Sequence, residues 1–203
     1  MRKAFTMIEL IFVIVIIGIL AAVALPRLAG VQDDALISSE KSAMGSARSA
    51  VIAIRGRALA RGTDFNVSIV DKNGNTGYVT VAYDGGAAAA GDVKLTSAKY
   101  PVELSISTAT ITAGSKATAT QTAQNLDGAA LAVVMEPDGR ERFKTRAATG
   151  GTHGTMTVDT NDSIIAGPAS QAVADTAAEI TTNDSWVYDS GTGIFSLQKG
   201  AAY

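Results

Sequence analysis

The chain has 203 residues, a net charge of -2 and no cysteine. Without cysteine there are no disulfides or thiolate metal sites, and the slightly acidic balance provides no global basic surface of the kind that attracts nucleic acid. Aromatic residues make up only 5% of the chain, and the part beyond residue 62 is rich in Ala, Gly, Ser and Thr, a composition typical of short strands and turns around a lightly built core.

The first predicted element is an apolar helix near the N-terminus. The segment from Arg2 to Leu28 reads RKAFTMIELIFVIVIIGILAAVALPRL, and it carries no charge between Leu10 and Leu25. Counted from Phe5, the run is long enough to cross about 30 Å of hydrocarbon. Because Arg2 and Lys3 precede it, the positive-inside rule places the N-terminus in the cytoplasm and everything after Leu28 outside.

Two ordinary explanations of this helix leave Glu9 without a role. A secretory signal is one, since Ala22-Val23-Ala24 offers a cleavage site of the A-x-A type. A simple membrane anchor is the other. A carboxylate opposes insertion in both cases, and charges inside membrane segments are by default functional. Glu9 therefore favours a third explanation.

The segment closely resembles the N-terminus of type IV prepilins and their pseudopilin relatives, with a short basic leader, a small residue and then Phe-Thr-Met-Ile-Glu-Leu before an apolar helix. The resemblance implies that a prepilin peptidase and methyltransferase cuts between Ala4 and Phe5 and methylates the new amine of Phe5. The family most often has glycine before the cut, whereas this chain has Ala4. A single extra methyl group is expected to slow processing at most.

Cleavage supplies a partner for Glu9. It creates an ammonium group at Phe5, one helical turn away, so the two charges can partly satisfy each other within one subunit. In a staggered filament, the carboxylate of Glu9 can instead pair with the Phe5 amine of a neighbour in a dry core, where the attraction is barely screened. The resemblance implies that this pairing sets the register of assembly, and methylation keeps the charge of the amine.

Gly18 and Pro26 mark the part of the helix that is weakest. Proline removes an amide donor, and glycine is a poor helix former. Both positions match the family, in which the enclosed segment becomes extended on assembly, and the same loss of helicity is predicted for Ile19 to Leu25. A kink within a continuous helix is the alternative.

Residues 29–62 are predicted to form the amphipathic half of the helix, with Gly62 as its C-cap. Apolar residues spaced by three and four should pack against a sheet: Leu28, Val31, Ala35, Met44, Ala47, Val51, Ile54 and Ala58. Four arginines fall late in the helix, at Arg48, Arg55, Arg57 and Arg61, where they complement its dipole. They are interpreted as a solvated helix end in preference to a DNA-binding stripe.

Residues 63–203 are predicted to be a strand-rich head. Hairpins are expected where strands flank turn residues: Asn66 to Val70 with Tyr78 to Tyr83, Ala130 to Met135 with Arg140 to Thr145, and Trp186 to Tyr188 with Ile194 to Leu197. Together with Val102 to Thr112 they give one antiparallel sheet. A long helix on such a sheet is an α+β architecture, and the resemblance implies the pilin fold. The predicted regions are a leader at 1–4, a filament-core helix at 5–28, the amphipathic half at 29–62 and the head.

The head offers little material for catalysis or metal binding. His153 is the single histidine and is placed in a loop, so neither an enzyme nor a transition-metal site is expected. Asp71, Asn73 and Asn75 alternate like calcium ligands, but the glycine does not fall where an EF-hand needs it, and a hairpin turn is the favoured explanation. Asp184 with Asp189 is a weaker calcium candidate still.

Asparagine sequons in the head suggest modification. Asn66, Asn161 and Asn183 each precede a serine at the second following position, which is the acceptor pattern for N-glycosylation. Asp64 and Asp159 stand two places before the first two, as in the extended sequon of some bacterial enzymes. The sequence thus makes Asn66 and Asn161 the candidate acceptors.

These features predict a structural subunit without catalytic activity or a required cofactor. The resemblance implies that it waits in the inner membrane with its head in the periplasm and that an assembly platform polymerises it into an extracellular type IV pilus. A periplasmic pseudopilus of a type II secretion system is the alternative within the same architecture. A soluble β-rich binding module, cut after Ala24, is the alternative from a different class.

Overall fold

The computed structural model describes residues 6–71, 73–85, 89, 91–102, 104, 111–117, 131–135, 143–148, 150–153, 156–167 and 185–198, without the side chains of 25–34, 144, 146, 147 and 153. The chain divides into two units, Met1–Ser39 and Glu40–Tyr203.

A single α-helix, α1, runs from Met7 to Arg61. Its C-terminal end is closed by Gly62, which has a φ of 63° and donates its amide to the Ala58 carbonyl at 2.9 Å. Glycine is favoured at this position because a positive φ strains residues that have a Cβ. The predicted C-cap is therefore confirmed. The helix is unbroken from Gly18 through Pro26, and the loss of helicity expected on assembly stays a prediction.

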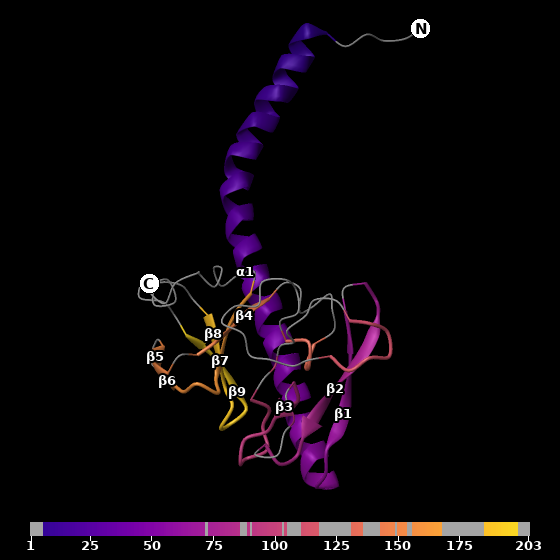
Figure 1. Ribbon diagram of the computed structural model, residues 1–203. Coiled ribbons are helices and arrows are strands. Elements are labelled where there is room, and N and C mark those ends of the chain that lie inside the picture. Colours follow the sequence, from indigo (N-terminus) through magenta and orange to yellow (C-terminus); the bar gives the residue numbers. More distant parts are fainter. Residues whose placement is uncertain are drawn as a thin grey trace. The chain divides into compact units, whose positions relative to one another are not determined.

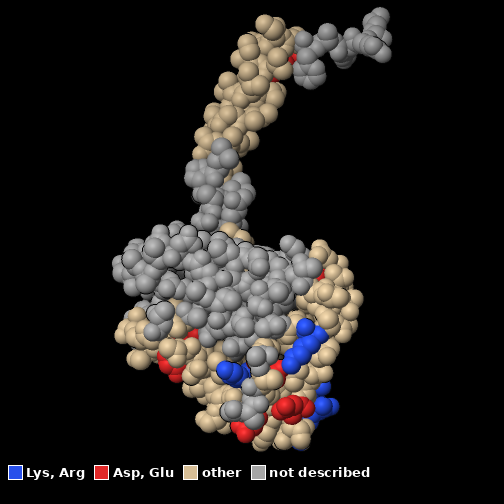
Figure 2. Space-filling model, in the orientation of Figure 1, with Lys and Arg blue, Asp and Glu red and all other residues tan. Residues whose placement is uncertain are grey.

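In the first unit, the helix from Met7 to Ala24 is long and apolar enough to cross a membrane, and none of this stretch is buried. A signal sequence near an N-terminus would pass the same test. Figure 2 shows the described surface of this stretch without charge, apart from red carboxylate atoms near its end. An isolated helix with apolar side chains on every face requires lipid or other protein to cover it.

In the second unit, the described residues combine residues 40–61 of α1 with nine strands in three sheets. The first sheet has the order β1-β2-β3, the second β4-β7-β8-β9 and the third β5-β6. The strands are β1 (Phe65–Val70), β2 (Thr76–Ala82), β3 (Val93–Lys94), β4 (Lys144–Ala147), β5 (Gly151–His153), β6 (Met156–Val158), β7 (Ser163–Ala166), β8 (Ser185–Asp189) and β9 (Ile194–Gln198). All pairings are antiparallel except the short one between β2 and β3.

The helix contributes one stripe to two hydrophobic clusters. Ile54 and Ala58 pack with the first sheet, and Met44, Ala47 and Val51 pack with the second. In the view of Figure 1, β1 and β2 lie to one side of this part of α1, and β7, β8 and β9 lie to the other. The predicted stripe is confirmed at these five positions, and the α+β class with a long N-terminal helix and antiparallel sheets is confirmed with it.

Other parts of the prediction were wrong. Ala35 is exposed, and the described strands form three sheets where one sheet was predicted. Residues 131–135 form turns, in which Leu131 accepts the amides of Val134 and Met135 at 2.9 Å. The predicted hairpin partner of 131–135 overlaps β4, and β4 pairs with β7 instead.

Two more strand assignments need correction. Within the predicted strand Val102 to Thr112, the described residues 102, 104, 111 and 112 lie outside any strand. His153 lies in β5 and pairs with Met156, where a loop had been expected. Both errors come from assigning short segments by composition, because pairing partners rather than composition decide the state of so few residues.

Candidate functional site

The helix begins with a reciprocal pair of hydrogen bonds between Thr6 and Glu9. The amide of Glu9 donates to Thr6 Oγ1 at 3.3 Å, and the Glu9 carboxylate oxygen Oε2 accepts from the Thr6 amide at 2.9 Å and from its hydroxyl at 2.8 Å. This is a capping box, in which a Thr at the N-cap and a Glu three residues later satisfy backbone donors that the helix leaves open. The sequence pattern T-x-x-E could have revealed it, but the prediction considered Glu9 only as a partner of the Phe5 amine.

The capping box uses only one oxygen of Glu9. Among the described residues, no donor forms a hydrogen bond to the other oxygen, Oε1, and the residues around it are exposed. The predicted cleavage residues Ala4 and Phe5 lie outside the described residues. All atoms of the box belong to Thr6 and Glu9, so it would survive a cut between Ala4 and Phe5. The N-cap residue Thr6 is thus separated from that cut by a single residue, Phe5.

Of the two residues predicted to weaken the helix, Gly18 is exposed, and a Cβ added there would meet nothing within 4 Å. No contact with the part of the chain that the structure describes therefore requires glycine at that position. The side chain of Pro26 is not among those described.

Among the late arginines of α1, Arg48, Arg57 and Arg61 are exposed, as expected of a solvated helix end, whereas Arg55 is half-buried. Arg55 Nε donates to the Ala98 carbonyl at 2.9 Å, and its guanidinium lies 4.9 Å from the centre of the Tyr100 ring. The guanidinium of Arg57 lies 4.7 Å from the Phe65 ring. Contacts of this kind hold a cation through the electron-rich ring face. Arg55 and Arg57 thus also contact the head.

Asp71 organises the turn between β1 and β2. The residue is 1% exposed. Its carboxylate accepts hydrogen bonds from the backbone amides of Asn73 and Asn75 at 2.8 Å, from the Asn75 side chain at 3.0 Å and from the distant Ile111 amide at 2.9 Å. These bonds, the one from Ile111 foremost, lower the pKa of Asp71 to about 2. Gly74 completes the turn with a φ of 81°. The favoured hairpin explanation agrees with this geometry.

A calcium ion at Asp71, Asn73 and Asn75 would have to replace the donors that now occupy the carboxylate, and calcium binding there stays a prediction. Asp189 is occupied in the same way by the amides of Gly191 and Thr192 and by the Thr192 hydroxyl. Its suggested partner Asp184 lies outside the described residues. In the described part of the chain, no group of three or more His, Cys, Asp or Glu residues is arranged to hold a metal ion.

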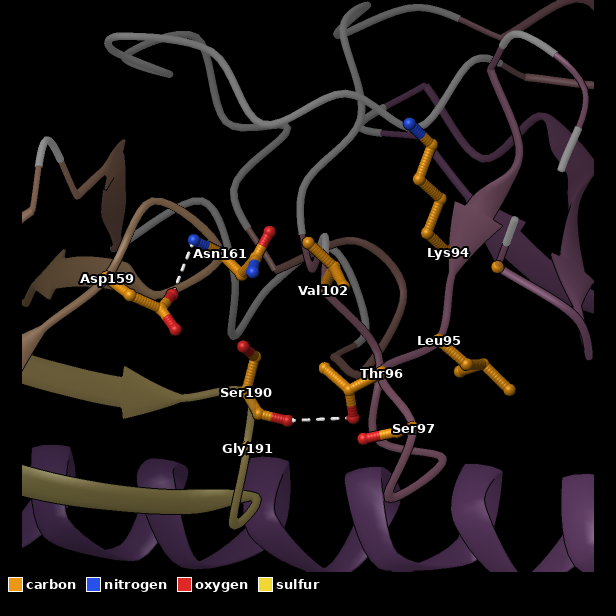
Figure 3. A pocket seen from close by; sticks show the side chains of 10 residues that line it. Lys94, Leu95, Thr96, Ser97, Val102, Asp159, Asn161, Ser190 and Gly191 are labelled. Atoms are coloured by element: carbon orange, nitrogen blue, oxygen red, sulfur yellow. Dashed lines mark hydrogen bonds between the residues drawn. The ribbon is translucent and has the colours of Figure 1, made fainter.

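The two candidate glycosylation acceptors lie in different settings. Asn66 lies within β1, opposite Thr80, whose hydroxyl donates to the Asn66 side chain at 3.2 Å. Asn161 lies in an exposed turn, where its backbone N–H donates to the Asp159 carboxylate at 2.7 Å. Asn161 also lines a hollow of about 410 Å³, together with Thr96, Ser97 and Ser190 (Figure 3). The serine that completes its sequon, Ser163, is 3% exposed.

One buried contact was missed by the sequence reasoning. Trp186 in β8 donates its indole N–H to Glu40 Oε1 at 2.9 Å, although the two residues are 146 positions apart. Glu40 is only 4% exposed. Gly167 lies so close that a Cβ there would come within 2.6 Å of the Glu40 carboxylate and the Phe143 ring. The final hairpin is thus joined to the helix by this bond as well as by packing.

Residues 1–25 match the family model described as the prokaryotic N-terminal methylation motif. This motif is the prepilin-type cleavage and methylation segment of type IV pilins and pseudopilins. The resemblance stated for this segment is therefore confirmed. Neither the curated proteins nor the solved structures gave a match to the chain.

Proposed function

We propose that this protein is a structural subunit that is cut between Ala4 and Phe5, methylated at Phe5 and polymerised into a type IV pilus or a related helical filament. Before assembly, α1 holds it in the inner membrane with its head in the periplasm. Its partners are the prepilin peptidase and methyltransferase, an inner-membrane assembly platform and further copies of itself. The methylation motif at residues 1–25 supports processing, and the exposed apolar helix Met7–Ala24 supports burial against other copies.

The observation that carries this proposal is the state of Glu9. Leaving a carboxylate in an apolar environment costs several kcal/mol unless it is paired and hydrogen-bonded. The capping box supplies hydrogen bonds to Oε2 but no opposite charge, and Oε1 has no bonded donor among the described residues. Oε1 is thus available to the Phe5 ammonium of a neighbouring copy. That pairing would fix the axial register between subunits.

Hydrophobic burial supplies most of the affinity between copies. The side chains of Met7 to Val23 include a run of large apolar residues that are 41% to 78% exposed in the isolated chain. Burial is worth roughly 0.8 kcal/mol for each CH₂ group removed from water. A filament that surrounds this helix with like helices would be very stable outside the membrane. The charge pair would then decide the register, while the apolar contacts decide the strength.

Glu9→Ala tests the proposal. We expect the variant to be cut and methylated normally, because the motif around the cleavage site is otherwise intact, but to lose at least nine-tenths of its filaments as measured in the sheared surface fraction. Leu10→Ala is the matched control, since it truncates the adjacent exposed residue and keeps the charge. Normal filament yield from Glu9→Ala would contradict the role given to the carboxylate.

The same motif is found in pseudopilins, which makes a short periplasmic filament of a secretion system the second candidate. Both functions use the same subunit chemistry. They differ in whether the filament extends outside the cell or stays in the periplasm. Electron microscopy of cells that overexpress the protein, compared with a deletion strain, separates them. Long surface filaments support the pilus, and their absence together with a secretion defect in the deletion strain supports the pseudopilus.

A further inference from the structure

The hollow that Asn161 lines lies where three connecting segments of the head meet. Its lining comes from the loop that follows β3, from the turn between β6 and β7 and from the turn between β8 and β9. All of these segments belong to the second unit of the chain. The volume of about 410 Å³ lies within the range of small-molecule sites, roughly 300 to 1,000 Å³.

Buried hydrogen bonds hold these segments in place. Asp162, which is only 4% exposed, accepts the backbone amide of Ser190 at 2.9 Å, the Ser190 hydroxyl at 3.2 Å and the Asp159 amide at 3.0 Å. On the other side of the hollow, the Thr96 hydroxyl donates to the Ser190 carbonyl at 3.1 Å. A lining that the fold already orders loses little conformational freedom when a ligand binds.

Several polar groups of the lining are not used by these bonds. Asp159 accepts the Asn161 backbone N–H through Oδ1, and no donor among the described residues bonds to its Oδ2. The side-chain amide of Asn161 and the hydroxyl of Ser97 likewise form no hydrogen bond with the described part of the chain. In Figure 3, Asp159 and Asn161 lie across the hollow from Thr96 and Ser97. A ligand between them would meet both donors and acceptors.

The chemistry of these groups favours a neutral ligand that is rich in hydroxyls. A carboxylate oxygen accepts from O–H groups, whereas an amide and a hydroxyl both donate and accept. Figure 3 shows the ammonium group of Lys94 directed away from the other lining residues, so the charge at the hollow is that of Asp159. A negative charge disfavours acidic ligands. Val102 adds apolar surface, and a pyranose ring offers neighbouring hydroxyls together with an apolar C–H face.

We propose that the hollow binds one pyranose unit of a neutral saccharide, with Asp159 Oδ2, the Asn161 side-chain amide and the Ser97 hydroxyl as its polar contacts. The inference goes beyond the proposed function, because the site lies within one subunit and does not require assembly. A ligand of this size is expected to bind with a Kd on the order of 1 mM. A filament would repeat the site along its length and would thereby bind a polysaccharide more tightly.

An NMR titration of the full chain tests the site. The protein is produced without attached sugar, as verified by intact mass, and is held in a phosphocholine detergent, which contains no saccharide. The ligands are the methyl glycosides of glucose, galactose, mannose and N-acetylglucosamine, and EDTA is present so that no cation bridges ligand and protein. We expect at least one glycoside to shift the backbone amide signals of Thr96, Ser97, Asn161 and Gly191 in a saturable manner while the signals of β1 stay unchanged.

Single substitutions identify the contacts. Asn161→Ala removes the side-chain amide but keeps the backbone N–H, and we expect it to weaken binding at least fivefold. Addition of Ser97→Ala to it should abolish measurable binding. Asn73→Ala is the matched control, because Asn73 is also exposed and its backbone N–H also bonds to an aspartate two residues earlier. Its Kd should stay within twofold of the wild-type value.

Three results would overturn this inference and leave the proposed function intact: no saturable shift with any of the four glycosides, shifts that lie outside the hollow, or unchanged affinity in Asn161→Ala. Protein from its own host distinguishes two sources of the saccharide. If it carries a sugar increment in its mass and binds no added glycoside, the ligand is a glycan attached to the chain. If it binds the added glycoside, the ligand is an external saccharide.

Discussion

At the scale of single residues, we assign to Glu9 two functions that use different oxygens. Oε2 closes the helix start through Thr6, and Oε1 is the oxygen that we assign to the neighbouring amine. The backbone donors at the start of a helix must be satisfied before the segment enters lipid, because no water is available there. A glutamate at this position therefore suits the membrane state as well as the filament.

Replacement of Thr6 separates the two functions. In Thr6→Ala the Glu9 amide loses its acceptor, so we expect its hydrogen exchange in detergent micelles, measured by NMR, to become about fivefold faster. Thr6→Ser keeps the hydroxyl and should exchange like the wild-type protein. Equal exchange in wild type and Thr6→Ala would contradict the capping box.

Asp71 gives the head a pH-dependent component of stability. Its pKa is about 2 in the folded chain and 3.8 ordinarily, so its contribution is complete above pH 3.8 and is lost as the pH falls towards 2. In Asp71→Asn the side-chain NH₂ group would face an N–H donor such as that of Ile111. We expect Tm at pH 7 to fall by roughly 5 °C.

The control for this change is its pH profile. Between pH 5 and pH 2, the difference in Tm between Asp71→Asn and the wild-type protein should shrink, because protonation weakens the same bonds in the wild type. A difference that stays constant across this range would show that the carboxylate charge plays no part.

At the scale of elements, the sequence predicted those parts whose signals are local. The helix stripe from Met44 to Ala58 and the hairpins β1-β2 and β8-β9 were found because their periodicity and their turn residues lie next to one another in the chain. Gly62, Gly74 and Gly193 all have positive φ values, which agrees with their assignment to a helix end and two turns. The final turn is further held by the Asp189 carboxylate.

The missed elements depend on distant partners. The β4 strand pairs with β7, and no turn motif joins the two. All four residues of β7 are buried, so the alternation that marks a half-exposed strand is absent. The bond between Glu40 and Trp186 was missed because the two residues are remote in sequence. The Thr6 capping box was local and could have been found.

The bond between Trp186 and Glu40 joins β8 to the helix. Substitutions of these two residues should therefore be energetically coupled. Trp186→Phe leaves Glu40 Oε1 buried without this donor, and we expect a loss of about 1 to 3 kcal/mol in urea unfolding followed by circular dichroism. Glu40→Met should also be destabilising, because it removes the acceptor of the buried Trp186 N–H. The double variant should cost less than the sum of the two, by at least 0.5 kcal/mol, whereas additive effects would mean that the bond contributes nothing.

At the scale of the whole molecule, the chemistry of the N-terminus separates a filament subunit from a secreted module. Intact mass and N-terminal sequencing of the protein from its host should give a chain that begins at Phe5 and carries one added methyl group. A chain that begins at Leu25 would instead indicate a cut after Ala24 and a released soluble head. The same mass spectrum would reveal any sugar on Asn66 or Asn161 as a further increment.

The chain contains one tryptophan, and the contact of its indole with Glu40 gives the protein a built-in optical probe. Indole fluorescence shifts to longer wavelength when the ring meets water, and in this protein the whole signal comes from the junction between the last hairpin and the helix. Solutions of dissociated filaments can therefore be monitored for intact heads without any attached dye. A blue emission that persists after the polymer is dispersed would mean that the subunits separate as folded bodies.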